Sequence, residues 1–70
     1  MANENRKQSL INKINNLRRQ IAEKEATILR IKQKSSGINS GDKNSIAMLE
    51  RHIANFETQI ISLQSELDKL

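Results

Sequence analysis

Few side chains in this 70-residue sequence belong to the types that perform acid–base or metal chemistry. They are one histidine, His52, and a group of carboxylates that includes Glu50, Glu57, Glu66 and Asp68. Carboxylates at such helical spacings most often solvate a helix surface, and one histidine without any cysteine makes no set of nitrogen or sulfur metal ligands. A glycine-rich phosphate loop and a serine in a nucleophile elbow are also absent. The sequence therefore predicts a non-enzymatic protein with no catalytic residue, no metal ligand and no cofactor.

The elements that must carry these side chains are two helices in a single domain of residues 1–70. Proline is absent, and both glycines lie in the segment 35–41, which is the only cluster of helix-breaking residues. We predict a helix over about 5–35, a loop over about 36–41 and a helix over about 42–70. Gly37 is expected to be a left-handed C-terminal cap, and Asp42 the N-cap of the second helix, with Ser45 as the competing choice.

Apolar residues repeat in both halves at alternating steps of three and four, which are the a and d positions of heptads. This pattern predicts an all-α, antiparallel, coiled-coil-like hairpin. A single unbroken helix in a long parallel coiled coil is the alternative, and it is disfavoured because the glycines and serines of the loop have low helix propensity. The predicted hairpin seam consists of Leu10, Ile14, Leu17, Ile21, Ile28, Ile31, Ile46, Leu49, Ile53, Phe56, Ile60, Leu63 and Leu67, with Leu70 continuing the pattern.

Lys24 interrupts this seam at a d position. A polar seam residue can fix the register of two helices at a cost in stability. A lysine can also extend its ammonium past its apolar neighbours into solvent. The second interpretation is favoured, and both stay open at this point.

Further apolar residues lie outside the seam, and they predict a surface that one hairpin cannot bury. They are Ile11, Ala22, Ala26, Leu29, Ala47, Met48, Ala54 and Ile61, of which Ala47, Ala54 and Ile61 recur at the b position. Alanine tolerates exposure, but Leu29 and Ile61 would each gain roughly 1.5–3 kcal/mol from full burial. The cover is either a second copy in a four-helix bundle or a different protein. The predicted partner-binding residues are Ile11, Leu29, Ala47, Ala54 and Ile61.

The two halves of the chain differ in charge. Residues 1–34 carry a net charge of +6, and residues 35–70 carry −2. This difference favours antiparallel pairing of the two halves and a partner with an acidic surface. Basic residues such as Lys13, Arg18 and Arg19 would also suit a nucleic-acid phosphate stripe, but no aromatic residue lies among them to stack on bases. Nucleic-acid binding is therefore the less favoured alternative.

No stretch is apolar enough to cross a membrane, and the first residues do not resemble a secretory signal. A cytoplasmic location is therefore expected.

The stretch 41–63, about a third of the chain, resembles the second helix of the small co-chaperones of type III secretion needle subunits, the YscE/PscE/EscE group. The matching residues are Gly41-Asp42, Ile46, Leu49, Glu50-Arg51, Phe56-Glu57-Thr58, Ile60 and Leu63. The resemblance implies a helical hairpin that joins a helical-repeat chaperone and helps it keep a secretion needle subunit soluble. Two further hypotheses are a dimeric hairpin that binds RNA and a structural coiled-coil protein.

Overall fold

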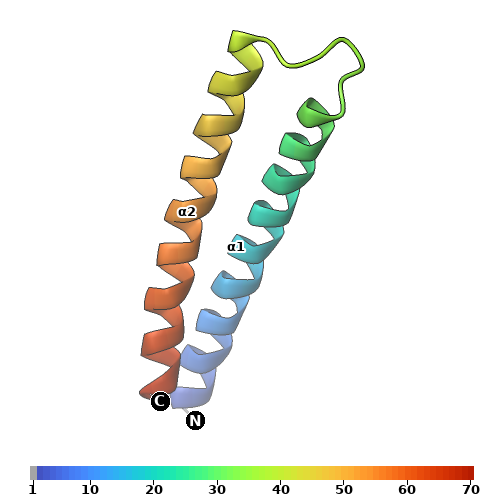
Figure 1. Cartoon of the computed structure of the whole chain (residues 1–70). Coiled ribbons are helices and arrows are strands. Elements are labelled where there is room, and N and C mark those ends of the chain that lie inside the picture. Colours follow the sequence, from blue (N-terminus) through green and yellow to red (C-terminus); the bar gives the residue numbers. More distant parts are fainter. Residues whose placement is uncertain (1) are drawn as a thin grey trace.

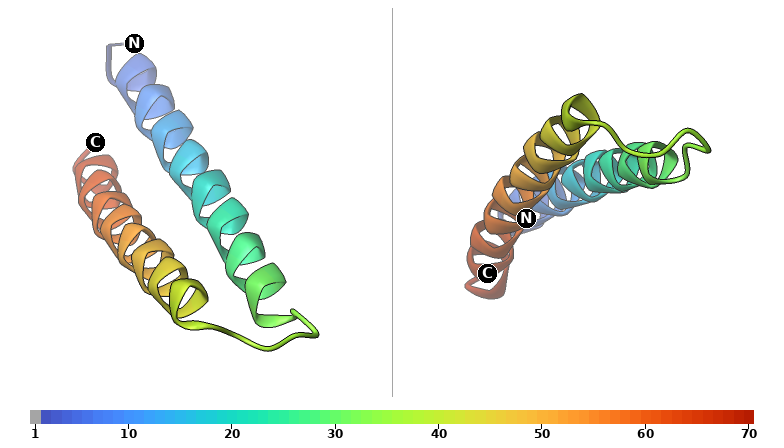
Figure 2. Two further views of the ribbon diagram at one scale, coloured as in Figure 1. Left: turned by 90° about the horizontal axis from the view of Figure 1, so that it is seen from above. Right: turned by 45° about the horizontal axis from the view of Figure 1, so that its top comes forward.

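The computed structural model describes residues 2–70 and contains two long helices, α1 (Ala2–Lys32) and α2 (Ser40–Asp68). They run antiparallel and are joined by residues 33–39, so that the two ends of the chain lie together at the end opposite the loop (Figure 1). The left view of Figure 2 shows the helices side by side and joined through this loop, and in the right view α2 passes in front of part of α1. The predicted all-α, antiparallel two-helix hairpin is confirmed.

The helix boundaries differ from the predicted ones at the loop. Helix α1 ends at Lys32, three residues before the predicted end, and α2 begins at Ser40, two residues before the predicted start. At the end of α1, the backbone N–H of Gln33 still donates to the carbonyl of Leu29, but that of Lys34 donates to Ile31, which is a tighter turn. This tighter turn comes just before Ser35 and Ser36, which are poor at continuing a helix.

Gly37 adopts the positive φ that was predicted, at 89°. It does not cap α1 directly, because it lies five positions beyond Lys32, and its backbone N–H donates to the carbonyl of Lys34 over 3.2 Å. The glycine therefore turns the loop rather than the end of the helix.

The N-cap of α2 is Asn39, so the prediction of Asp42, with Ser45 as the alternative, is wrong. The side chain of Asn39 accepts a hydrogen bond from the backbone N–H of Asp42 at 2.7 Å, and the side chain of Asp42 accepts one from the backbone N–H of Asn39 at 3.2 Å. This reciprocal pair is a capping box, in which the acidic residue stands three positions after the cap. Asp42 therefore belongs to the first turn of α2, and Ser45 lies within the helix.

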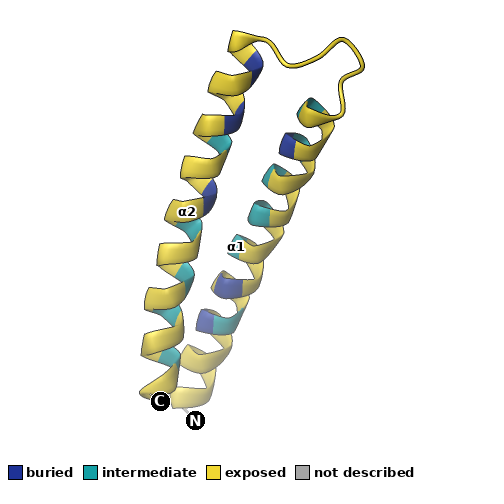
Figure 3. Cartoon of the chain, viewed as in Figure 1, coloured by how far each residue is buried: buried dark blue, intermediate teal, exposed yellow. Residues whose placement is uncertain are grey.

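The core is the strip where the two helices face each other (Figure 3). Leu10, Ile14, Ile28, Ile46 and Ile53 are buried. The other residues of the predicted seam are half-buried, namely Leu17, Ile21, Ile31, Leu49, Phe56, Ile60, Leu63 and Leu67, whereas Leu70 is exposed. Among the described residues no large side chain is completely buried, as expected where only two helices meet.

Lys24 is half-buried in this strip. Its ammonium nitrogen lies 5.7 Å from the centre of the Phe56 ring, which is within the range of a cation–π contact. The lysine at the interrupted seam position is thus directed at the aromatic ring of the opposite helix.

Candidate protein-binding surface

Among the described residues, the histidine and carboxylate side chains that could take part in acid–base or metal chemistry do not gather into one site. Between residues 2 and 70, no three His, Cys, Asp or Glu side chains come close enough to hold a metal ion. His52, Glu50, Glu57 and Asp68 are exposed, and Glu66 makes a long contact of 3.9 Å with Arg6. Such an exposed ion pair contributes little to stability.

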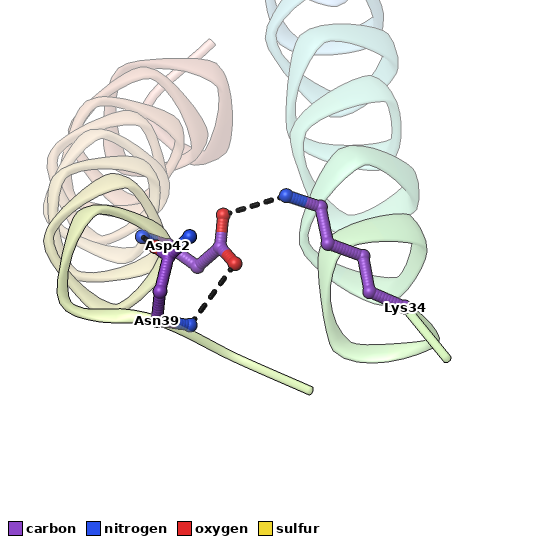
Figure 4. A network of polar contacts seen from close by, with 3 residues as sticks. All are labelled: Lys34, Asn39 and Asp42. Carbon is purple, nitrogen blue, oxygen red and sulfur yellow. Dashed lines mark hydrogen bonds and ion pairs between the residues drawn. The ribbon is translucent and has the colours of Figure 1, made fainter. Parts of the chain in front are cut away.

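Asp42 is the one buried charged residue of the described chain, and its role is structural. Its carboxylate accepts a hydrogen bond from the ammonium of Lys34 at 2.8 Å and another from the backbone N–H of Asn39 (Figure 4). The bond from Lys34, followed by the one from Asn39, holds the pKa of Asp42 below its usual value. This network joins the loop residue Lys34, two positions beyond the end of α1, to the first turn of α2.

The contact between Lys34 and Asp42 indicates which residues of α1 and α2 lie at similar heights along the hairpin. Because the helices run antiparallel, equal numbers of residues counted back from Lys34 and forward from Asp42 lead to about the same height, and the groove that Asn16 and Gln59 line together gives nearly the same pairing. Five residues lead to Leu29 and Ala47, and a further heptad in each direction leads to Ala22 and Ala54. The next heptad leads to Asn15 and Ile61. All these positions are b positions, so they form three successive rows across the hairpin.

One side face of the hairpin is polar. A shallow groove on it is lined by Lys13 and Asn16 from α1 and by Gln59 and Ser62 from α2, above the seam residues Leu17 and Leu63. The four polar residues occupy heptad positions g and c of their helices, and so this face carries the g and c positions of both helices. Between residues 3 and 69, Met48 is the only apolar residue at a g or c position.

The opposite side face carries the b and e positions of both helices, because these lie on the other side of the seam. We call its apolar residues the apolar flank, and it consists of Ile11, Ala22, Leu29, Ala47, Ala54 and Ile61. In an antiparallel pair the e and b positions of the two helices fall on the same side. Apolar residues from both helices are therefore brought to a single face.

The five residues predicted to bind a partner all belong to this flank. Leu29 and Ile61 are 56% and 69% exposed, and Ala47 and Ala54 are also exposed. Ile11 is half-buried, because its e position lies next to the seam. Exposed large aliphatic residues aligned on one face mark an interaction surface more strongly than scattered ones.

Besides Leu70 at the end of the seam pattern, two large apolar residues of the described chain are exposed outside the flank. Met48, which is 57% exposed, lies on the polar face because it occupies a c position. Ile38 is 40% exposed in the loop, and sequence reasoning missed it because an isolated apolar residue among serines and glycines gives no periodic signal.

The basic residues of α1 do not form one stripe. Lys13 and Arg30 occupy g and c positions on the polar face, whereas Arg18 and Lys32 occupy e positions on the face of the apolar flank. A helix that follows a nucleic-acid backbone would present its cations on one side.

Neither described helix contains a segment with the length and hydropathy needed to cross a bilayer. A scan against protein-family models finds no family that matches this chain, and searches of curated proteins and of solved structures find no similar protein.

Proposed function

We propose that this protein is a non-enzymatic adaptor that binds another helical protein through the apolar flank. The observation that carries this proposal is the difference between the two side faces of the hairpin. Between residues 3 and 69, the g and c positions of one face carry a single apolar residue, Met48, whereas the b and e positions of the other carry six, of which Leu29 and Ile61 are large and exposed.

The energetics support a covered flank. Covering the exposed parts of Leu29 and Ile61 would contribute on the order of 1 kcal/mol each, since full burial of such side chains contributes roughly 1.5–3 kcal/mol. The alanines between these two residues allow a second helix to approach closely, which is how helices pack in bundles.

The specific form of the proposal is a cytoplasmic co-chaperone of type III secretion. It rests on the resemblance of residues 41–63 to that family and on the hairpin layout, with a helical-repeat chaperone and a needle subunit as partners. In such a complex the apolar flank would pack against a helix of the chaperone, and the basic α1 would face acidic residues on it.

The experiment compares Leu29→Glu with Met48→Glu. The two side chains are 56% and 57% exposed, yet they occupy opposite side faces, so each is a matched control for the other. The tagged chain is used to capture partners from a lysate of its source, with and without nuclease, and a captured protein is then purified and titrated against each variant.

We expect Leu29→Glu to weaken binding of the purified partner by at least about tenfold, because a charge replaces a buried aliphatic group, and Met48→Glu to leave it unchanged. Equal binding by both variants would remove the flank from the proposal. Capture of nucleic acid alone, abolished at high salt and by Arg18→Glu, would replace the proposal with the RNA-binding hypothesis.

A further inference from the structure

We propose that a second copy of this chain covers the apolar flank when no other partner is bound. The two hairpins would pack face to face around a twofold axis parallel to their length, so that α1 of each packs on α2 of the other and both loops lie at the same end. This inference rests on the proposed function of the flank as a binding surface and adds the occupant and its arrangement.

The dimensions of the hairpin fit such a dimer. Its Cα trace extends over 56 × 15 × 12 Å, so one broad side projects an area of about 800 Å², and a second hairpin laid over its full length would cover a surface of the order of the roughly 800 Å² that each partner of a stable interface buries. The product is a four-helix bundle in which each helix is antiparallel to its two neighbours.

Charge selects the arrangement. With the axis along the hairpin, the half of the chain with net charge +6 packs twice against the half with net charge −2. With the axis across the hairpin, α1 would pack on α1 and α2 on α2, which brings like charges together. The e positions carry both signs along the face, so the charge of the whole helices decides between the two arrangements.

The rows of the flank also fit this arrangement. Because the axis keeps heights unchanged, Leu29 meets Ala47 of the second copy, and Ala22 meets Ala54 of the second copy. Leu29 thus packs over a small side chain in the first row, two alanines meet in the second, and Ile61 meets Asn15 of the second copy in the third, so that two of the three rows are wholly apolar. Alternation of large and small residues is how facing layers of a bundle fill space.

The first test is the mass of the purified chain at micromolar concentration, measured by light scattering and by sedimentation. We expect twice the 8.0 kDa of one chain for the natural sequence and for Met48→Glu. Leu29→Glu should raise the dissociation constant about a hundredfold, because the symmetry axis places each change in the interface twice. Circular dichroism should show that both variants keep their helices, since both side chains are exposed in the hairpin.

The second test determines the arrangement with introduced thiols, which report cleanly because the chain has no cysteine. A mixture of Ala22→Cys and Ala54→Cys chains should form a mixed disulfide-linked dimer on mild oxidation, because the two positions would face each other at bridging distance. Each variant alone should form much less disulfide-linked dimer, because the introduced thiols of two identical chains would lie on diagonally opposite helices of the bundle.

The outcomes separate this inference from the proposed function. A monomer, or a larger oligomer, would overturn the two-copy bundle, and disulfide formation by Ala22→Cys alone would overturn its axis. In either case the proposed function would stand if a purified partner still distinguished Leu29→Glu from Met48→Glu. A dimer with the expected disulfide but without any partner that distinguishes these variants would support the bundle and remove the adaptor proposal.

Discussion

Asp42 contributes to stability through its charge. The ammonium of Lys34 and the backbone N–H of Asn39 both stabilise its ionised form in the folded chain, so its folded pKa lies below the unfolded value of about 3.9. This contribution is present in full above about pH 4 and disappears as the pH falls through the lowered folded pKa.

We therefore expect Asp42→Asn to be less stable than the natural chain at pH 7, with a difference that shrinks as the pH falls below about 4. Urea unfolding followed by circular dichroism at several pH values measures this difference. A difference that stays constant down to about pH 2 would show that the charge of Asp42 plays no part.

Lys24 is a charged residue at a seam position where an apolar residue is expected. In the half-buried seam its ammonium lies over the Phe56 ring, an interaction that contributes about 0.5–1 kcal/mol. We expect Lys24→Leu to raise the free energy of unfolding by about 1 kcal/mol, because burial of the leucine side chain outweighs the cation–π interaction that the substitution removes.

Urea unfolding measures the stability of Lys24→Leu, and the mass in solution reports on register. An increase in stability without a change in mass would fit the lysine that extends past its neighbours. A new oligomeric state would instead assign Lys24 the register role.

At the scale of the elements, the loop depends on Gly37. Its φ of 89° is unfavourable for other residues, although an added Cβ would meet no atom within 4 Å. We expect Gly37→Ala to cost about 1–2 kcal/mol through the backbone alone. Gly37→Asn should cost less, since asparagine tolerates this conformation better. Equal destabilisation of the two variants in chemical unfolding would contradict this explanation.

The start of α2 depends on Asn39. Removal of its side chain in Asn39→Ala should cost about 1 kcal/mol, the usual contribution of an N-cap. Ser45→Ala should be neutral or slightly stabilising, because Ser45 lies within the helix and alanine is the better helix former. If thermal unfolding showed a larger loss of stability for Ser45→Ala than for Asn39→Ala, the assignment of Asn39 as the N-cap would be contradicted.

The sequence predicted the helices well because periodicity is a property of many residues. Thirteen apolar seam residues, with Lys24 at the one interrupted position, repeat at steps of three and four, and one polar residue among so many positions changes the prediction little. The ends of the helices were harder to predict, because each end depends on which of a few neighbouring residues acts as the cap. Asn39 and Asp42 are both good caps, and only the reciprocal bonds between them assign the first as the cap and the second to the first turn.

The candidate surface could be predicted only in part. The b position of Ala47, Ala54 and Ile61 is visible in the sequence, but the alignment of Leu29 with Ala47 depends on how the two helices pair in space, which the sequence pattern does not give. Met48 is also apolar and outside the seam, but it was not among the predicted partner-binding residues, and its c position puts it on the polar face.

At the scale of the whole molecule, the hairpin is long and thin, with a core of one strip and two unlike side faces. A chain of this size without disulfides gains much of its stability from regular helix packing or from association. We propose that the apolar flank is covered by another protein chain in the functional state, whether that chain is a second copy or a different partner.

The reactivity of thiols introduced by Leu29→Cys and Met48→Cys tests this claim most directly, since the two positions are almost equally exposed in the hairpin alone. The labelling rate of each thiol is measured in the assembly, which is the purified chain at micromolar concentration or its complex with a captured partner. The rate in denaturant is the reference. We expect the thiol at position 29 to react at least about tenfold more slowly than that at position 48 in the assembly, and both to react alike in denaturant. Equal rates in the assembly as well would show that nothing covers the flank and would contradict the account.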